Sequence, residues 1–270
     1  MKKSFLLLIL FFSIFQINAQ EKISTREMNL INWMEFAEFV PRQINTVLLP
    51  TGTLEPHGVV NNGADNTAPT AMAKDMAEEI NALIAPTLNY GITGSMAAYP
   101  GAFQITEAAY RPFIRDILKG LAKNGFKNII ILNGHGGGQT KVLQEVAGEI
   151  ANELGVRTLV INWWSFASDV TLEVFKEDGG HAGLNETAYI QAIDPTLVHK
   201  EKYNSDMATA YPETGAWSAT PFPSSIGLYL EGQGYPNFNQ TQADEYFQKV
   251  NAKVSAFIQE VIKKWDLAGL

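Results

Sequence analysis

The sequence has 270 residues, of which 46% are hydrophobic and 18% charged, and its formal net charge is −8. This composition is typical of a folded globular protein, and the acidic balance argues against nucleic acid or an anionic membrane surface as partner. Cysteine is absent, which excludes disulfides, thiolate metal ligands and a lipid anchor on an N-terminal cysteine.

The chain begins with the pattern of a secretory leader. Two lysines precede an apolar run from Phe5 to Ile17, and the small residue Ala19 follows. The run is too short for a membrane span. We therefore predict a signal peptide over residues 1–19, a single domain over residues 20–270, and an exported protein that works in the periplasm or outside the cell, without membrane insertion after leader cleavage.

A helix and a strand are expected next. Apolar residues at helical spacing predict a helix within residues 24–43 that ends at Pro41. Residues 45–49 predict the first buried strand, which we expect to break at Pro50. A second helix should start near Thr67 and Pro69, just after Asp65. Its expected apolar face consists of Met72, Met76, Ile80 and Leu83.

Strand and helix then alternate. A glycine-rich irregular segment over residues 86–105 precedes a helix over residues 106–123, which Asn124 and Gly125 should close. The later elements follow in the order strand 128–132, helix to Leu154, strand 157–162 and helix 241–266. Such alternation predicts a parallel α/β sheet with ligands at the carboxyl ends of its strands. Residues 203–240 favour a long ordered loop over the active-site rim or at a subunit contact.

Three ionisable side chains stand together after the first strand. Glu55 and His57 are two residues apart, so both would leave the same face of an extended segment, and Asp65 precedes the next helix. Carboxylate and imidazole groups suit zinc, manganese or iron. Surface chemistry or a helix cap is the alternative for such a loop taken alone.

Further histidines follow two later apolar segments. His135 lies in the run Asn133–Gly138, and His181 lies in the glycine-rich run Asp178–Thr187. Three of the four histidines therefore stand in glycine-flanked loops, which favours a shared site over core packing. The fourth, His199, is expected at the surface.

Taken together, these loops resemble the creatininase (creatinine amidohydrolase) family over about residues 30–265. The motifs that carry the resemblance are Gly52–Gly58 with Asp65, Tyr99-Pro100-Gly101, Asn133–Gly137, His181-Ala182-Gly183 with Glu186-Thr187, and Gly232-Gln233-Gly234. The resemblance implies a three-layer αβα domain, commonly a homo-oligomer, and a binuclear metal centre that hydrolyses C–N bonds in small or cyclic amides such as creatinine through a metal-bridged hydroxide.

The resemblance also assigns roles to single residues. Glu55 and His57 would bind different ions, Asp65 would bridge them, and His135 would complete the first. The family's further carboxylate, two places after this histidine, is Gly137 here, so we assign the remaining ligand to Glu186. The expected ions are two divalent cations, zinc first and manganese or iron as the other candidates. His181 would carry a proton to the leaving nitrogen.

The remaining site residues are expected to contact the substrate. Backbone N–H groups of Gly136 and Gly137 could stabilise a developing oxyanion. Trp163 and Trp164 could wall the pocket, or they could form a core or subunit-interface pair.

The match to the family is not complete. The loop over residues 59–64 is one residue shorter than the family's and lacks its second histidine, and Gly180 replaces a carboxylate. The substrate is therefore expected to differ, and export fits scavenging of an external amide. A non-catalytic ligand-binding protein on the same fold is the main alternative. The glycine-rich run after His135 lacks the Gly-Lys-Ser/Thr ending of a phosphate-binding loop, which argues against nucleotide binding there. The sequence also lacks the Gly-x-Ser-x-Gly motif of a serine hydrolase.

Overall fold

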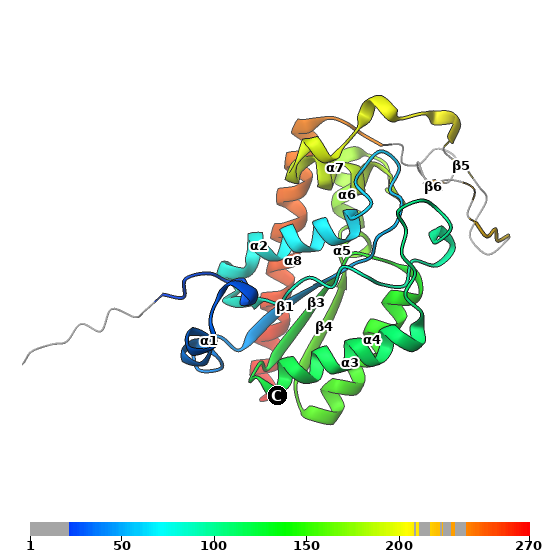
Figure 1. Ribbon diagram of the computed structural model, residues 1–270. Helices are drawn as coiled ribbons and strands as arrows, with labels where there is room; N and C mark the ends of the chain where they lie inside the picture. The colour runs from blue at the N-terminus through cyan, green and yellow to red at the C-terminus, as the bar shows by residue number, and fades with distance from the viewer. Residues whose placement is uncertain (1–21, 208, 211–216, 222, 224–227, 230–235) are drawn as a thin grey trace, which may run out of the picture.

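A parallel sheet with strand order β2-β1-β3-β4 forms the centre of the molecule (Figure 1). Its strands are β1 (Thr46–Thr51), β2 (Ala82–Ile84), β3 (Asn128–Asn133) and β4 (Arg157–Asn162). The computed structural model describes residues 22–207, 209–210, 217–221, 223, 228–229 and 236–270. The leader, the Gly232-Gln233-Gly234 motif and much of the loop expected over residues 203–240 lie outside these residues.

Helices cover both faces of this sheet (Figure 1). One face packs against α1 (Trp33–Phe39), α3 (Glu107–Lys123) and α4 (Gly137–Leu154). The other packs against α2 (Ala64–Ile80), α5 (Trp163–Phe166), α6 (Ser168–Phe175), α7 (Leu184–Ile193) and α8 (Gln240–Leu267). Short 3₁₀ turns and a two-residue strand pair, β5 (Thr209–Ala210) with β6 (Leu228–Tyr229), complete the described elements. The expected three-layer αβα arrangement is confirmed.

Alternating side chains explain why the central strands are continuous apolar runs. Leu48 and Ile130 belong to the core beneath α2, whereas Val47, Leu49 and Ile131 belong to the core beneath α3 and α4. Every residue of β1 and β3 is buried because helices cover both faces of the sheet. Among the described helices, none combines the length and apolarity needed to cross a membrane.

The region around α2 differs from the expectation. The helix starts at Ala64, so Asp65 lies in its first turn and Pro69 lies inside the helix. Asn81 adopts a left-handed φ of 56° and ends the helix. Leu83, expected on the helix, therefore belongs to β2, which pairs with β1.

The expected break at Pro50 is also wrong, because Pro50 is part of β1. Its carbonyl accepts a hydrogen bond from the backbone nitrogen of Leu88 at 3.0 Å, on the side where β2 has already ended. The nitrogen and carbonyl of one strand residue point the same way, so the missing N–H removes no bond to β3. The first helix is shorter than predicted and covers only Trp33–Phe39, and α6 was not foreseen.

Candidate metal centre and active site

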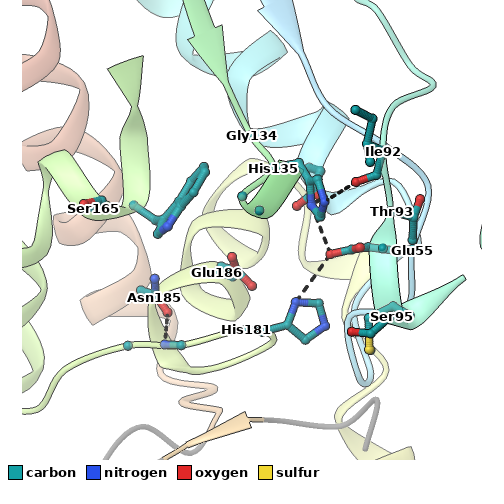
Figure 2. A pocket seen from close by; sticks show the side chains of 18 of the residues that line it. Glu55, Ile92, Thr93, Ser95, Gly134, His135, Ser165, His181, Asn185 and Glu186 are labelled. Carbon is teal, nitrogen blue, oxygen red and sulfur yellow. Dashed lines mark hydrogen bonds and ion pairs between the residues drawn. The ribbon is translucent and has the colours of Figure 1, made fainter. Parts of the chain in front are cut away.

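The predicted site residues meet at the carboxyl ends of β1 and β3 (Figure 2). The loop after β1 supplies Glu55 and His57, the first turn of α2 supplies Asp65, and the loop after β3 supplies His135. Because β1 and β3 are hydrogen-bonded neighbours, their loops open at the same edge.

Two glycines allow the start of α2 to reach this edge. A Cβ added at Gly134 would lie 1.9 Å from the backbone oxygen of Asp65, and one added at Gly52 would lie 2.3 Å from the same atom. Both distances are far below van der Waals contact, so a side chain at either position would displace α2. The glycines that directly follow β1 and β3 thus place the Asp65 carboxylate between the two loops.

Asp65 faces a histidine with each of its oxygens. Its Oδ2 lies 2.9 Å from Nδ1 of His135, which is also 3.3 Å from Oε1 of Glu55. Its Oδ1 lies 3.0 Å from Nε2 of His57, which is also 3.5 Å from Oε2 of Glu186. Two groups of potential ligands therefore share Asp65: a first triad of Glu55, Asp65 and His135, and a second triad of His57, Asp65 and Glu186.

Backbone carbonyls fix the tautomers of the histidines. His57 Nδ1 is 3.2 Å from the carbonyl of Glu55, and His135 Nε2 is 2.9 Å from the carbonyl of Ile92. A carbonyl can only accept, so these ring nitrogens carry the hydrogen and the opposite ring nitrogen presents a lone pair. Those lone pairs face carboxylate oxygens, an arrangement that requires a proton or a cation between them.

Unpartnered buried atoms support the same conclusion. Glu55 Oε2, His57 Nε2 and Asp65 Oδ2 are sealed from solvent and form no hydrogen bond. Such atoms are costly unless something satisfies them. A donor set of imidazole nitrogens and carboxylate oxygens fits divalent transition-metal ions, so the residues present suit a metal centre.

Without cations, protons occupy these positions. Burial opposes a charge on His57, but the nearby carboxylates, Asp65 first, outweigh it and raise its pKa to about 10. Burial also opposes a charge on His135, but its interactions with the Asp65 and Glu55 carboxylates outweigh burial and raise its pKa well above the ordinary value. Burial would raise the pKa of Asp65, yet the two histidines hold it well below its usual range.

His181 and Glu186 come from the loop before α7 and its first turn. Glu186 Oε2 accepts a hydrogen bond from the backbone nitrogen of Ala182 at 2.7 Å, and burial raises the pKa of Glu186 to about 7. His181 Nε2 is 2.7 Å from the carbonyl of Pro56, which leaves Nδ1 free, 3.5 Å from Glu55 Oε1. Burial and the neighbouring His57 lower the pKa of His181 to about 4, so its imidazole is neutral.

His181 also belongs to a third possible ligand group, with Glu55 and His57. This group competes with its expected role in proton transfer. We favour proton transfer, because the first and second triads already use Glu55 and His57 together with the centrally placed Asp65.

A cavity of about 600 Å³ opens above these residues. Trp164, Gly136 and Gly137, three of the four residues predicted to contact a substrate, line it. Trp163 does not, since it is 2% exposed and packs on Tyr189 at 4.7 Å between ring centroids. The two tryptophans thus separate into one cavity residue and one core residue. Among the described residues that line the cavity, none is lysine or arginine.

Two buried amides near the site were not singled out from the sequence. Gln139, in the first turn of α4, is fully buried and accepts a hydrogen bond from the Ile92 nitrogen at 3.1 Å. It also donates to Asn133 Oδ1 at 3.1 Å, so it links the last residue of β3 to Ile92, whose carbonyl orients His135. Asn185, next to Glu186, lines the cavity. Adjacency to a motif was the only signal for either residue.

The family model described as creatinine amidohydrolase, the creatininase family, matches residues 29–258. The chain belongs to the creatininase family. The predicted resemblance is therefore confirmed, and with it an enzyme of the hydrolase class that acts on C–N bonds other than peptide bonds.

Individual relatives agree with this membership. Creatinine amidohydrolase of Pseudomonas putida is 26% identical over 218 residues, which cover 73% of this chain and 84% of the relative. The 3-dehydro-scyllo-inosose hydrolase of Thermotoga maritima is 28% identical over 171 residues, 59% of this chain and 54% of that protein. The chain thus matches about half the length of the second relative, whose name gives a different substrate.

Solved creatininase structures share the fold. A crystal structure of creatinine amidohydrolase aligns with a TM-score of 0.77 at 23% identity, covering 88% of this chain and 98% of that one. A manganese form of creatininase and a zinc–zinc form of a creatininase mutant align with TM-scores of 0.76, each at 23% identity over 87% of this chain and 98% of theirs.

Proposed function

We propose that this chain is an exported hydrolase that cleaves a C–N bond in a small, uncharged cyclic amide with the help of two divalent cations. The observation that carries the proposal is the pair of ligand triads that share Asp65 at the floor of a cavity. A protein that had lost turnover would have little reason to retain both triads. The leader pattern of residues 1–19 supports export.

The first triad (Glu55, Asp65, His135) would hold one cation and the second triad (His57, Asp65, Glu186) the other. When bound, two such ions would supply a Lewis acid for the amide carbonyl and would lower the pKa of the attacking water towards neutrality. Zinc is our first choice and manganese or iron the others, in keeping with the zinc and manganese forms of creatininase.

His181 is proposed to move the proton. Its Nε2–H is held by the carbonyl of Pro56, so Nδ1 is the atom that can accept a proton and pass it to the leaving nitrogen. The neutral state that burial imposes suits the first of these steps. Gly136 and Gly137 present backbone at the cavity wall, where a substrate could approach closely.

The cavity favours an uncharged substrate. Its charged lining residues are acidic or belong to the histidine cluster, and the described lining offers no basic side chain to a carboxylate or phosphate. Creatinine and other cyclic amides or ureides meet this condition. The Thermotoga relative is named for 3-dehydro-scyllo-inosose, which contains no nitrogen, so turnover of that compound would argue against C–N cleavage by this chain. We also propose a homo-oligomer, on family resemblance alone.

Elemental analysis and a substrate panel test the proposal together. We expect close to two transition-metal ions per chain in the protein purified from residue 20 onward, and hydrolysis of creatinine, hydantoin or another ring amide. One ion or none after reconstitution with zinc or manganese would contradict the binuclear centre. Two ions without turnover of any panel compound would favour the non-catalytic binding protein.

A further inference from the structure

One polar side chain at the cavity has no role in the chemistry described so far. Asn185 lies on α7 next to Glu186, is only 4% exposed, and lines the cavity (Figure 2). A buried carboxamide normally uses both its oxygen and its nitrogen. The use of each atom therefore indicates what this residue does.

The loop before α7 fixes the orientation of the carboxamide. Asn185 Oδ1 accepts a hydrogen bond from the backbone nitrogen of Gly180 at 3.1 Å. A backbone N–H can only donate, so the atom that faces it is the oxygen and the amide cannot be flipped. A Cβ at Gly179 would lie 2.1 Å from both Cγ and Oδ1 of Asn185, so the loop encloses this side chain closely.

The nitrogen of the same amide is left without a partner. No residue in the described part of the chain accepts a hydrogen bond from Asn185 Nδ2. The atom is also not sealed from solvent, unlike the unpartnered buried atoms of Glu55, His57 and Asp65. Figure 2 shows the nitrogen on the side of the carboxamide opposite the bond to Gly180. The N–H donors of Nδ2 are therefore available to a molecule in the cavity.

We propose that Asn185 Nδ2 donates a hydrogen bond to a second acceptor atom of the substrate, away from the bond that is broken. This inference rests on the proposed function and narrows its substrate class. The substrate is an uncharged ring amide that carries, besides the scissile carbonyl, another carbonyl oxygen or an unprotonated ring nitrogen. A simple lactam lacks this acceptor and would leave the buried donor unpaired.

The structure separates this contact from the cations. Asn185 belongs to none of the three groups of potential ligands, and its oxygen is occupied by Gly180. The residue thus contacts the substrate and not the metal. Its loss should weaken ligand binding while the metal content stays the same.

The test compares two ring amides on zinc-loaded protein: hydantoin, which has a second carbonyl, and 2-pyrrolidinone, which has one carbonyl only. Dissociation constants are measured by calorimetry, or as KM where the compound is hydrolysed. The variants are Asn185→Asp, whose carboxylate still accepts from Gly180 but cannot donate at the second oxygen, and Asn185→Ala, which removes the donor without adding charge. Asn204→Asp is the matched control, because Asn204 is exposed and its oxygen also accepts from a backbone nitrogen.

We expect the wild type to prefer hydantoin, and both Asn185 variants to bind hydantoin about ten- to hundred-fold more weakly. Binding of 2-pyrrolidinone and zinc content should stay as in the wild type, and Asn204→Asp should change neither. An unchanged preference in both variants, or a wild type that binds neither compound, would overturn the inference. Loss of the preference in a protein that hydrolyses nothing would uphold it and contradict only the proposed hydrolysis.

Discussion

The centre has two halves that are built differently. The inner half, Glu55, Asp65 and His135, stands on the ends of β1 and β3 and the first turn of α2. The outer half, His181, Asn185 and Glu186, stands on a glycine-rich loop and the first turn of α7. The side chains of Glu55, Asp65 and His135 are 3%, 4% and 12% exposed, and those of Glu186 and His181 are 14% and 18% exposed.

This difference separates two tasks. The inner half is fixed by strand pairing and by the close approach of α2 to two glycines, which suits ligands that must hold a cation at short range. The outer half is held mainly by bonds within its own loop, and of these three bonds only the one from His181 Nε2 to the carbonyl of Pro56 reaches the loop after β1, which suits contacts with a substrate. Substitutions in the inner half should therefore lower metal content. In the outer half, His181 should affect turnover and Asn185 substrate binding, whereas Glu186, as a proposed ligand of the second ion, should also affect metal content.

The largest effect is expected for Asp65→Asn. The substitution removes one negative charge from both triads at once, so metal content should fall from about two ions per chain to below one, and activity should fall about a thousandfold or more. Elemental analysis and a creatinine assay measure both quantities. Asp116→Asn, an exposed change of the same chemistry on α3, is the control. Full metal content in Asp65→Asn would refute the shared-ligand assignment.

His181→Ala tests the outer half. We expect unchanged metal content and a loss of about 10²–10⁴-fold in kcat, the usual contribution of a positioned acid or base. Added imidazole should restore part of the rate if proton transfer is the lost step. A drop in metal content would instead assign His181 to the third ligand group with Glu55 and His57.

Gln139→Met should give an intermediate effect within the inner half. The substitution removes the carboxamide that accepts a hydrogen bond from the Ile92 nitrogen, and the Ile92 carbonyl is the group that orients His135. Affinity for the first ion should therefore fall about 10–100-fold. The second ion should be retained, because none of its ligands depends on this bond. Chelator competition on the metal-free protein measures both affinities. Gln144→Met, on the exposed side of the same helix, should leave both unchanged.

The smallest effect is expected away from both halves. Arg111 on α3 bridges Glu145 and Glu149 on α4 at the surface. Exposed ion pairs contribute little, so Glu145→Gln should shift Tm by no more than about 3 °C and leave metal content unchanged. A large loss of metal in this variant would show that the centre responds to general destabilisation, and the separation between the halves would then fail.

Much of this organisation could be predicted from the sequence. The strand that precedes His135 is a buried apolar run followed by a Gly-rich turn, and this pattern survives in the fold because burial on both faces dictates it. Glu55, His57, Asp65 and His135 carry chemistry that few other roles explain. Their convergence in space followed from the parallel topology alone.

Other features depend on contacts that the sequence does not display. Pro50 stays in β1 only because β2 ends before it, and Leu83 leaves α2 because Asn81 turns left-handed. Trp163 and Trp164 are adjacent, yet the turn into α5 sends one to the core and the other to the cavity. The role inferred for Asn185 depends on the hydrogen bond from the Gly180 N–H, because this bond fixes which end of the carboxamide is the oxygen.

The bonds that orient the three imidazoles have a consequence for divergence between relatives. His57, His135 and His181 are all held by main-chain carbonyls, those of Glu55, Ile92 and Pro56. Every amino acid supplies such a carbonyl, so the hydrogen bond that orients His135 does not depend on which side chain stands at position 92. The orientation of the ligands can then be conserved through the backbone conformation, without conservation of the side chains that supply the carbonyls. A comparison of sequence motifs alone will therefore underestimate the number of distant relatives that retain the same centre.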